Sequence, residues 1–128
     1  MKLPNKIFSR ASKIEFEKEI YTSKNGGIYK LLGGRTRRTK NVCILYTIPN
    51  NSFYKHPNIK GFQRAELDLL WSILSKNRIL TTLDFKNNCP ELYEEGSCCF
   101  SAFWGIINVL FPNTFIKSHG KIPFLKTK

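Results

Sequence analysis

The segment from Gly33 to Lys40 carries the residue types best suited to chemistry. It reads Gly-Gly-Arg-Thr-Arg-Arg-Thr-Lys and places four cations, Arg35, Arg37, Arg38 and Lys40, within six residues. Arginine guanidinium groups bind phosphate oxygens in pairs, threonine hydroxyls add neutral hydrogen bonds, and glycine lets backbone amides approach an anion closely. These residues predict a loop that binds phosphate groups.

The chain around this loop lacks any acidic side chain. The 46 residues from Ile20 to Ala65 contain no Asp or Glu, so no carboxylate within the stretch can neutralise its cations. We assign three further cations of the stretch, Lys30, Lys55 and Lys60, to the same phosphate-binding surface. Aromatic rings between the cations are suited to stacking on unpaired bases, which favours single strands or RNA. These rings are Tyr21, Tyr29, Tyr46, Phe53 and Tyr54.

The net charge of +12 over 128 residues is concentrated at the two ends of the chain. Residues 1–60 hold thirteen basic and three acidic side chains, residues 61–113 hold four and six, and residues 114–128 hold four and none. Such a distribution predicts an anionic partner. DNA or RNA is the leading interpretation, an acidic protein site is the alternative, and we expect no membrane partner. The C-terminal cations are Lys117, His119, Lys121, Lys126 and Lys128, and we assign the first three of them to the phosphate-binding residues as well.

Groups for catalysis are few. Glu66 and Asp68 are two residues apart, which directs them to different sides of a helix. His56 or His119 together with nearby cations would suit a small metal-independent ribonuclease, which is the third interpretation. The sequence contains no Gly-rich nucleotide loop and no Gly-x-Ser-x-Gly or His-Glu-x-x-His motif. We therefore expect a protein that binds rather than catalyses, without catalytic residues or a cofactor.

The four cysteines do not form a Cys-x-x-Cys pair, the spacing typical of structural zinc sites. Folding could bring Cys89, Cys98, Cys99 and His119 together, but adjacent cysteines rarely act as a regular tetrahedral pair. We expect buried thiols and no metal. The N-terminus lacks the apolar stretch of a secretory signal, and no apolar run is long enough to span a bilayer. A soluble, cytoplasmic protein is expected.

The N-terminal half has the pattern of a small sheet. Apolar and acidic residues alternate over 14–20, which predicts a half-buried strand, and Asn25-Gly26 suits a tight hairpin turn. Two further apolar runs complete a three-stranded β-meander. Its elements are strands over 14–20, 28–32 and 42–48, with a loop over 33–41 and an irregular connection over 50–60.

The C-terminal half has helical periodicity. Leu67, Leu70, Trp71 and Leu74 follow the spacing of one helix face and predict a helix over 66–76, with Asn77 as its left-handed cap. A Ser/Thr-x-x-Asp/Glu capping box then begins a short helix. The remaining expected elements are that short helix after Thr81-Thr-Leu-Asp84, a longer helix from Ser97 to Phe111, and a hairpin over 114–125 that turns at His119-Gly120.

This order of elements resembles the winged helix-turn-helix superfamily over residues 62–126. The resemblance rests on Glu66 to Lys76 as first helix, Ile79 to Phe85 entering the second, Ser97 to Phe111 as third and Phe115 to Leu125 as wing. It implies that the third helix enters the major groove of DNA and that the wing lies against the backbone. The class expected for the whole chain is α+β, one domain over 1–128. Its basic β-rich part covers 1–60 and its winged-helix-like part, three helices plus a β-hairpin, covers 61–128.

The third helix departs from the resemblance in its composition. Between Ser97 and Phe111 there is no Arg, Lys, Gln or Asp, and the polar side chains that can contact a base are Ser97, Ser101 and Asn108. A helix that is apolar around most of its circumference is normally buried. We therefore expect this helix to form the core, with Ser101, Gly105 and Asn108 as a narrow stripe for close packing. Base readout should be weak or come from loops.

Overall fold

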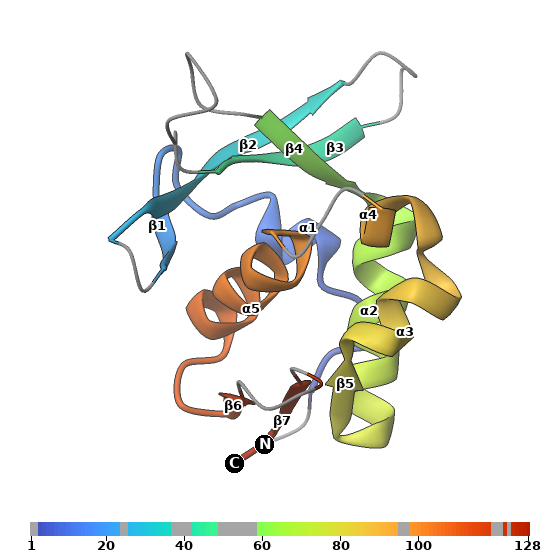
Figure 1. The fold of residues 1–128 in the computed structure, drawn as a ribbon. Helices are drawn as coiled ribbons and strands as arrows, with labels where there is room; N and C mark the ends of the chain where they lie inside the picture. Colours follow the sequence, from blue (N-terminus) through green and yellow to red (C-terminus); the bar gives the residue numbers. More distant parts are fainter. Residues whose placement is uncertain are drawn as a thin grey trace.

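Two antiparallel sheets lie at opposite ends of the molecule, with helices between them (Figure 1). The computed structural model describes residues 3–23, 26–36, 42–48, 59–94, 98–118, 122 and 124–128, and of residues 33–36 and 42 only the backbone. This arrangement confirms the expected α+β class. The elements in chain order are α1 (Phe8–Ala11), β1 (Glu19–Thr22), β2 (Ile28–Thr36), β3 (Val42–Thr47), β4 (Ile59–Gln63), α2 (Arg64–Asn77), β5 (Ile79–Thr81), α3 (Thr82–Asn88), α4 (Pro90–Glu94), α5 (Cys98–Leu110), β6 (Phe115–Ser118) and β7 (Phe124–Thr127).

The N-terminal sheet contains a fourth strand that the sequence did not reveal. Its order is β1-β2-β3-β4, and β4 begins at Ile59, within the segment 50–60 expected to be irregular, and continues to Gln63. Phe62 of β4 is fully buried opposite Ile44 of β3. Gly61 lies directly opposite Leu45, whose side chain occupies the space that a larger residue would need. A Cβ at position 61 would stand 2.7 Å from the Leu45 Cδ2 atom. Tertiary packing thus forms a strand in a run too short for a clear alternating pattern.

The strand expected over 14–20 is wrong for most of its length. β1 begins at Glu19, and Glu17 adopts a left-handed backbone conformation with φ 64°. The Lys18 amide donates to the Glu15 carbonyl at 3.2 Å, which closes a turn. Phe16 is 59% exposed, so the alternation does not mark a buried face here.

Strand β2 extends further than expected and passes through the first part of the Arg-rich segment. It ends at Thr36, with an irregular register between Leu31 and Gly33. Gly33 and Gly34 pair with Leu45 and Ile44 of β3, so both glycines belong to a strand and not to a loop. The expected hairpin between β1 and β2 is present, with Gly26 in a left-handed conformation at φ 85°.

Helix α2 is the expected first helix, two residues longer at its start and one at its end. A capping box begins the helix. In it the backbone amide of Gln63 donates to the Glu66 carboxylate at 2.8 Å. The left-handed residue after the helix is Arg78, with φ 64°, and not Asn77 as expected. Arg78 adopts a conformation that costs a non-glycine residue about 1 kcal/mol.

The capping box at the start of α3 is confirmed. The Thr81 amide donates to the Asp84 carboxylate at 2.8 Å, and the Asp84 amide donates to the Thr81 hydroxyl at 3.4 Å. Pro90 then begins the separate short helix α4, as suits a residue without an amide hydrogen.

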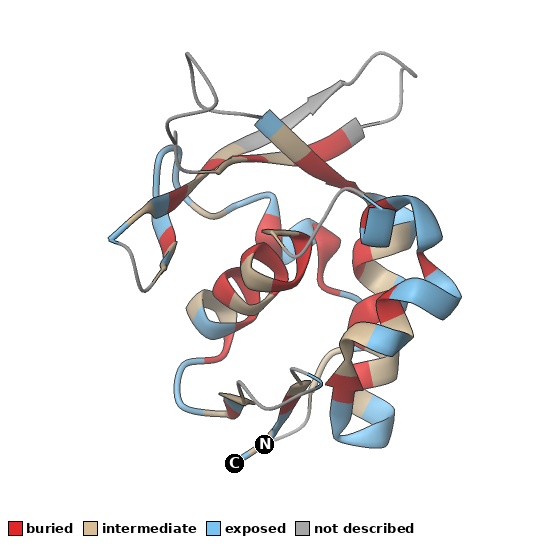
Figure 2. Cartoon of the chain, viewed as in Figure 1, coloured by how far each residue is buried: buried red, intermediate tan, exposed pale blue. Residues whose placement is uncertain are grey.

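Helix α5 forms the centre of the core, as expected from its composition (Figure 2). Gly105 permits a close approach to β1, since a Cβ there would stand 2.9 Å from the Ile20 Cβ atom and collide with the Ile20 carbonyl. Phe103 forms edge contacts with Phe62 and Phe85, and so links the sheet to α3. Of the expected small-residue stripe, Gly105 is packed closely, whereas Asn108 is exposed.

The C-terminal sheet has the order β5-β7-β6. Strands β6 and β7 form the expected antiparallel hairpin, whose turn at His119-Gly120 lies outside the described residues. Leu80 of β5 pairs with Leu125 of β7, and both are fully buried. The short extended stretch before α3 is therefore a strand of the same sheet as the hairpin.

The N-terminal segment is held along α2 by two kinds of polar contact. The Trp71 indole donates to the Pro4 carbonyl at 2.9 Å, and the Asp68 carboxylate accepts from the Ile7 and Phe8 amides at 3.0 Å each. Trp71 itself is fully buried and stacks on Phe111. Asp68 is one of the two carboxylates considered above for catalysis. In the structure it has a structural role, as the hydrogen-bond acceptor at the start of α1.

Candidate functional site

Four of the ten predicted phosphate-binding residues lie in the described part of the chain. Lys30, Arg35 and Lys60 are on the N-terminal sheet, Arg35 by its backbone position opposite Cys43, and Lys117 is on β6. The other six lie outside the described residues, and they are Arg37, Arg38, Lys40, Lys55, His119 and Lys121.

The register of the N-terminal sheet does not bring Lys30 and Lys60 onto one face. Lys30 is directly opposite Glu19 and Thr47, whereas Lys60 is opposite the fully buried Tyr46. Directly opposed residues share a face of a sheet. Lys60 therefore lies on the face that packs against the core, on strand β4 at the edge of the sheet, and Lys30 lies on the outer face with a carboxylate-bearing residue as its neighbour.

Lys117 is partly buried and its ammonium group is already engaged. Nζ donates to the Tyr21 hydroxyl at 3.0 Å and to the Ser101 hydroxyl at 3.4 Å, and it lies 4.3 Å from the centroid of the Tyr21 ring. These contacts join β6 to β1 and to α5. The side chain therefore connects the two ends of the molecule through its core helix.

Two of the aromatic residues proposed for base stacking are in the core. Tyr46 is fully buried and stacks on Phe62, with ring centroids 5.4 Å apart. Tyr29 is 9% exposed, and burial raises the pKa of its hydroxyl to about 12, with Cys98 and Tyr21 adding to the rise and a hydrogen bond with Ser101 opposing it. Neither ring is available to a base. Phe53 and Tyr54 lie outside the described residues.

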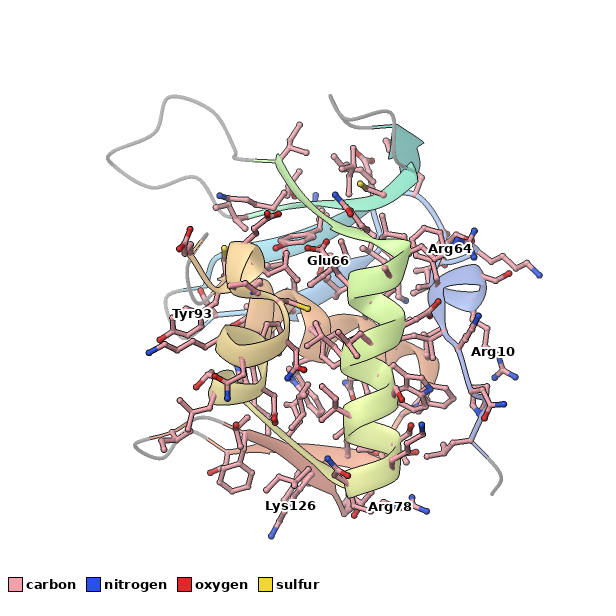
Figure 3. The ribbon with its side chains drawn as sticks, turned by 90° about the vertical axis from the view of Figure 1, so that its right-hand side faces the viewer. Arg10, Arg64, Glu66, Arg78, Tyr93 and Lys126 are labelled. Carbon is pink, nitrogen blue, oxygen red and sulfur yellow. The ribbon has the colours of Figure 1, made fainter. Side chains whose placement is uncertain are left out.

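Two cations line a cavity at the C-terminal end of α2. Lys76 and Arg78 are both exposed, and Arg78 lies at the base of this helix (Figure 3). The cavity has a volume of about 480 Å³. We call it the α2 cavity. Its lining consists of Leu3, Pro4, Asn5, Ser72, Ser75, Lys76 and Arg78.

The residues of the α2 cavity were not singled out from the sequence. A lysine in the last turn of a helix is explained by the negative end of the helix dipole, and Arg78 directly follows the helix, so neither cation by itself indicates a ligand site. The available signal is the spacing of Ser72, Ser75 and Lys76, which share one helix face at positions i, i+3 and i+4. Nothing local indicates that residues 3–5 form the opposite wall, because that contact depends on packing across more than 60 residues.

A smaller cavity of about 250 Å³ lies between α2 and the α3–α4 junction, lined by residues that include Glu66, Leu69, Cys89 and Glu91. Burial, and next the charge of Glu66, raise the pKa of the Cys89 thiol to about 11. The thiol is therefore protonated at neutral pH and is a poor nucleophile. All four cysteines are thiols, and three of them, Cys43, Cys89 and Cys99, are buried as expected.

The described chain is thus an α+β protein with cations near one end of α2 and on its N-terminal sheet. No cluster of three or more His, Cys, Asp or Glu side chains suited to a metal ion occurs among the described residues. None of the described helices has the length and apolar character needed to cross a membrane. Comparison with protein-family models, with curated proteins and with solved structures found no match.

Proposed function

We propose that this protein binds nucleic acid through phosphate contacts, with little direct readout of bases. The observation that carries the proposal is the separation of charge along the chain. Nine cations and no carboxylate occur between Ile20 and Ala65, while residues 61–113, which supply most of the helical core, have more acidic than basic side chains. A chain with this distribution of charge attracts a polyanion, and such binding weakens as the salt concentration rises.

The C-terminal half supports the finer proposal of a winged-helix-like unit. Helix α2, strand β5, helices α3 and α5 and the hairpin β6-β7 follow one another in the order of that architecture, with β7 between β5 and β6. Helix α4 is an addition between the second and third helices of the expected unit. This architecture commonly places its wing against nucleic acid.

The helix in the recognition position is not the element that reads bases in this proposal. Seven residues of α5 are buried, including Phe103 and Ile107, and α5 contacts β1 of the N-terminal sheet. Ser101 accepts a hydrogen bond from Lys117, which leaves Asn108 as the exposed polar side chain on the helix. Affinity then comes from cations on neighbouring segments, which hold the backbone irrespective of sequence.

A charge-matched pair of triple variants tests the proposal. We expect R35A/R37A/R38A to lose binding to labelled duplex DNA, single-stranded DNA and RNA in fluorescence anisotropy, with an unchanged melting temperature. The control K13A/K18A/K86A removes the same charge from exposed positions outside the Arg-rich segment. Equal losses in the two variants would show a diffuse electrostatic attraction without a site.

Two other outcomes would contradict the proposal. If the unmodified protein binds none of the three nucleic acids but binds polyglutamate, the basic surface serves an acidic protein. If labelled RNA is cleaved and cleavage disappears in His56→Ala or His119→Ala, the protein is a ribonuclease.

A further inference from the structure

We infer that the α2 cavity binds the terminal phosphate of a nucleic-acid strand. This inference rests on the proposed function and specifies which part of the nucleic acid occupies the α2 cavity. The cavity volume of about 480 Å³ is sufficient for a phosphate and the sugar that bears it.

Both walls of the cavity are fixed by contacts within the protein. One wall is the face of α2 that presents Ser72, Ser75 and Lys76. The other is the segment Leu3 to Asn5, held by the bond from the buried Trp71 indole to the Pro4 carbonyl at 2.9 Å. The amides of Ile7 and Phe8 anchor the same segment to Asp68 a few residues further on. The cavity is therefore preformed, which lowers the entropic cost of binding.

The charge of the lining matches a phosphate monoester. Lys76 and Arg78 provide two positive charges, which outweigh the partial negative charge at this C-terminal end of α2, and no carboxylate occurs among the described lining residues. A terminal phosphate carries a charge of about −1.5 to −2 at neutral pH, whereas a phosphodiester within a strand carries only one negative charge.

Neutral donors complete the site. The Ser72 hydroxyl and the Asn5 amide can donate to phosphate oxygens. The Ser75 hydroxyl donates to the Ser72 carbonyl at 3.3 Å, a long bond that a phosphate oxygen can replace. The guanidinium of Arg78 can hold two oxygens at once, which favours the exposed end of a monoester.

Three oligonucleotides of one sequence test the inference, with a 5′-phosphate, a 3′-phosphate or hydroxyls at both ends. We expect one phosphorylated form to bind about tenfold more tightly than the hydroxyl form, as corresponds to one or two charge-assisted hydrogen bonds. The double variant K76A/R78G should abolish this difference. Glycine suits the left-handed backbone at position 78, and alanine suits the helix at position 76, so the fold should be retained. The control K18A/K86A removes two exposed cations elsewhere and should keep the difference.

A second measurement separates the possible sources of the phosphate group. Inorganic phosphate and a nucleoside monophosphate are titrated while the melting temperature is recorded, because a ligand of the folded state raises it. The inference predicts a rise with the nucleoside monophosphate that is lost in K76A/R78G. A rise with inorganic phosphate, combined with equal affinity for all three oligonucleotides, would mean that the cavity holds a small anion and would overturn the inference.

The inference and the proposed function fail in different ways. If all three oligonucleotides bind equally and bind K76A/R78G as well as the unmodified protein, nucleic-acid binding stands and the terminal-phosphate site is wrong. If none of them binds, the proposed function is wrong and the inference falls with it. Ser72→Ala provides a check on the donors alone, since it should reduce the preference without removing a charge.

Discussion

Lys117 illustrates how a single side chain can serve the fold instead of a ligand. Its ammonium group contacts the Tyr21 and Ser101 hydroxyls and the face of the Tyr21 ring. Lys117→Met keeps most of the aliphatic stem but removes the donor and the charge. We expect the free energy of unfolding to fall by about 1–2 kcal/mol, measured by urea denaturation.

Lys126→Met is the matched control for this prediction. Lys126 is exposed on β7, the strand beside β6. Its replacement should change the free energy of unfolding by less than about 0.5 kcal/mol. Equal effects of the two substitutions would show that the contacts of Lys117 do not stabilise the fold.

Gly105 is required by the close approach of α5 to β1. An added Cβ would collide with the Ile20 carbonyl oxygen and stand 2.8 Å from its carbonyl carbon. Backbone atoms cannot rotate away, so we expect Gly105→Ala to destabilise the protein by about 2 kcal/mol or more, despite the better helix propensity of alanine. The loss of stability is measured by thermal unfolding of the variant and the unmodified protein. Asn108→Ala on the exposed side of the same helix should be neutral or slightly stabilising, and a similar loss there would contradict the packing argument.

Tyr29 should make stability depend on pH in the alkaline range. Burial raises the pKa of its hydroxyl to about 12, above the ordinary value of 10.0 expected in the unfolded chain. The folded state then holds the proton more tightly, so the stabilisation is complete below pH 10 and is lost as the pH rises from about 10 to 12. Urea denaturation at about pH 9.5 and 11.5 should show a fall of roughly 1–2 kcal/mol in the unmodified protein beyond that in Tyr29→Phe. An identical fall in both proteins would contradict this role.

At the scale of residues, the sequence identifies which side chains carry charge but not which charges are already engaged. Lys117 and Lys126 belong to the same basic C-terminal segment, yet one is tied to the core and the other is exposed. Strand register decides this difference, because a shift of one residue moves every side chain of a strand to the opposite face of the sheet. The α2 cavity was missed because its wall at residues 3–5 is distant in the chain from α2.

At the scale of elements, the cap of α3 provides a local test. The Thr81 hydroxyl accepts from the Asp84 amide, and the Asp84 carboxylate accepts from the Thr81 amide. We expect Thr81→Ala to lower the free energy of unfolding by about 1 kcal/mol, measured by urea denaturation. Thr82→Ala, at the first residue inside the helix, is the control and should have little effect. If the two substitutions have the same effect, the cap does not stabilise α3.

Elements with local signals were predicted well, and elements that depend on tertiary pairing were not. The spacing of Leu67 to Leu74 predicted α2, and the Thr81-Asp84 box predicted α3, because both signals lie within one or two helical turns. Strand β4 depends on pairing with β3, where the buried Phe62 lies opposite Ile44. The alternation over 14–20 misled because the chain turns at Glu17 before β1 begins.

At the scale of the whole molecule, the apolar core helix and the segments with net positive charge are different parts of the chain. The core helix α5 has no charged residue, and it lies between the two sheets (Figure 1). The net positive charge is carried before residue 61 and after residue 113 in the chain, and thus by segments that flank the core helices. A molecule built in this way is expected to bind a polyanion with a strength that depends on the number of phosphates contacted.

The dependence of affinity on salt tests this account most directly. The unmodified protein is titrated into labelled duplex DNA, single-stranded DNA and RNA, and the dissociation constant is measured by anisotropy between about 50 and 200 mM salt. If six or more cations contact phosphates, the affinity should fall about thousandfold over this range, with a steep linear plot of log K against log salt. An affinity that does not change with salt would contradict binding through the phosphate backbone.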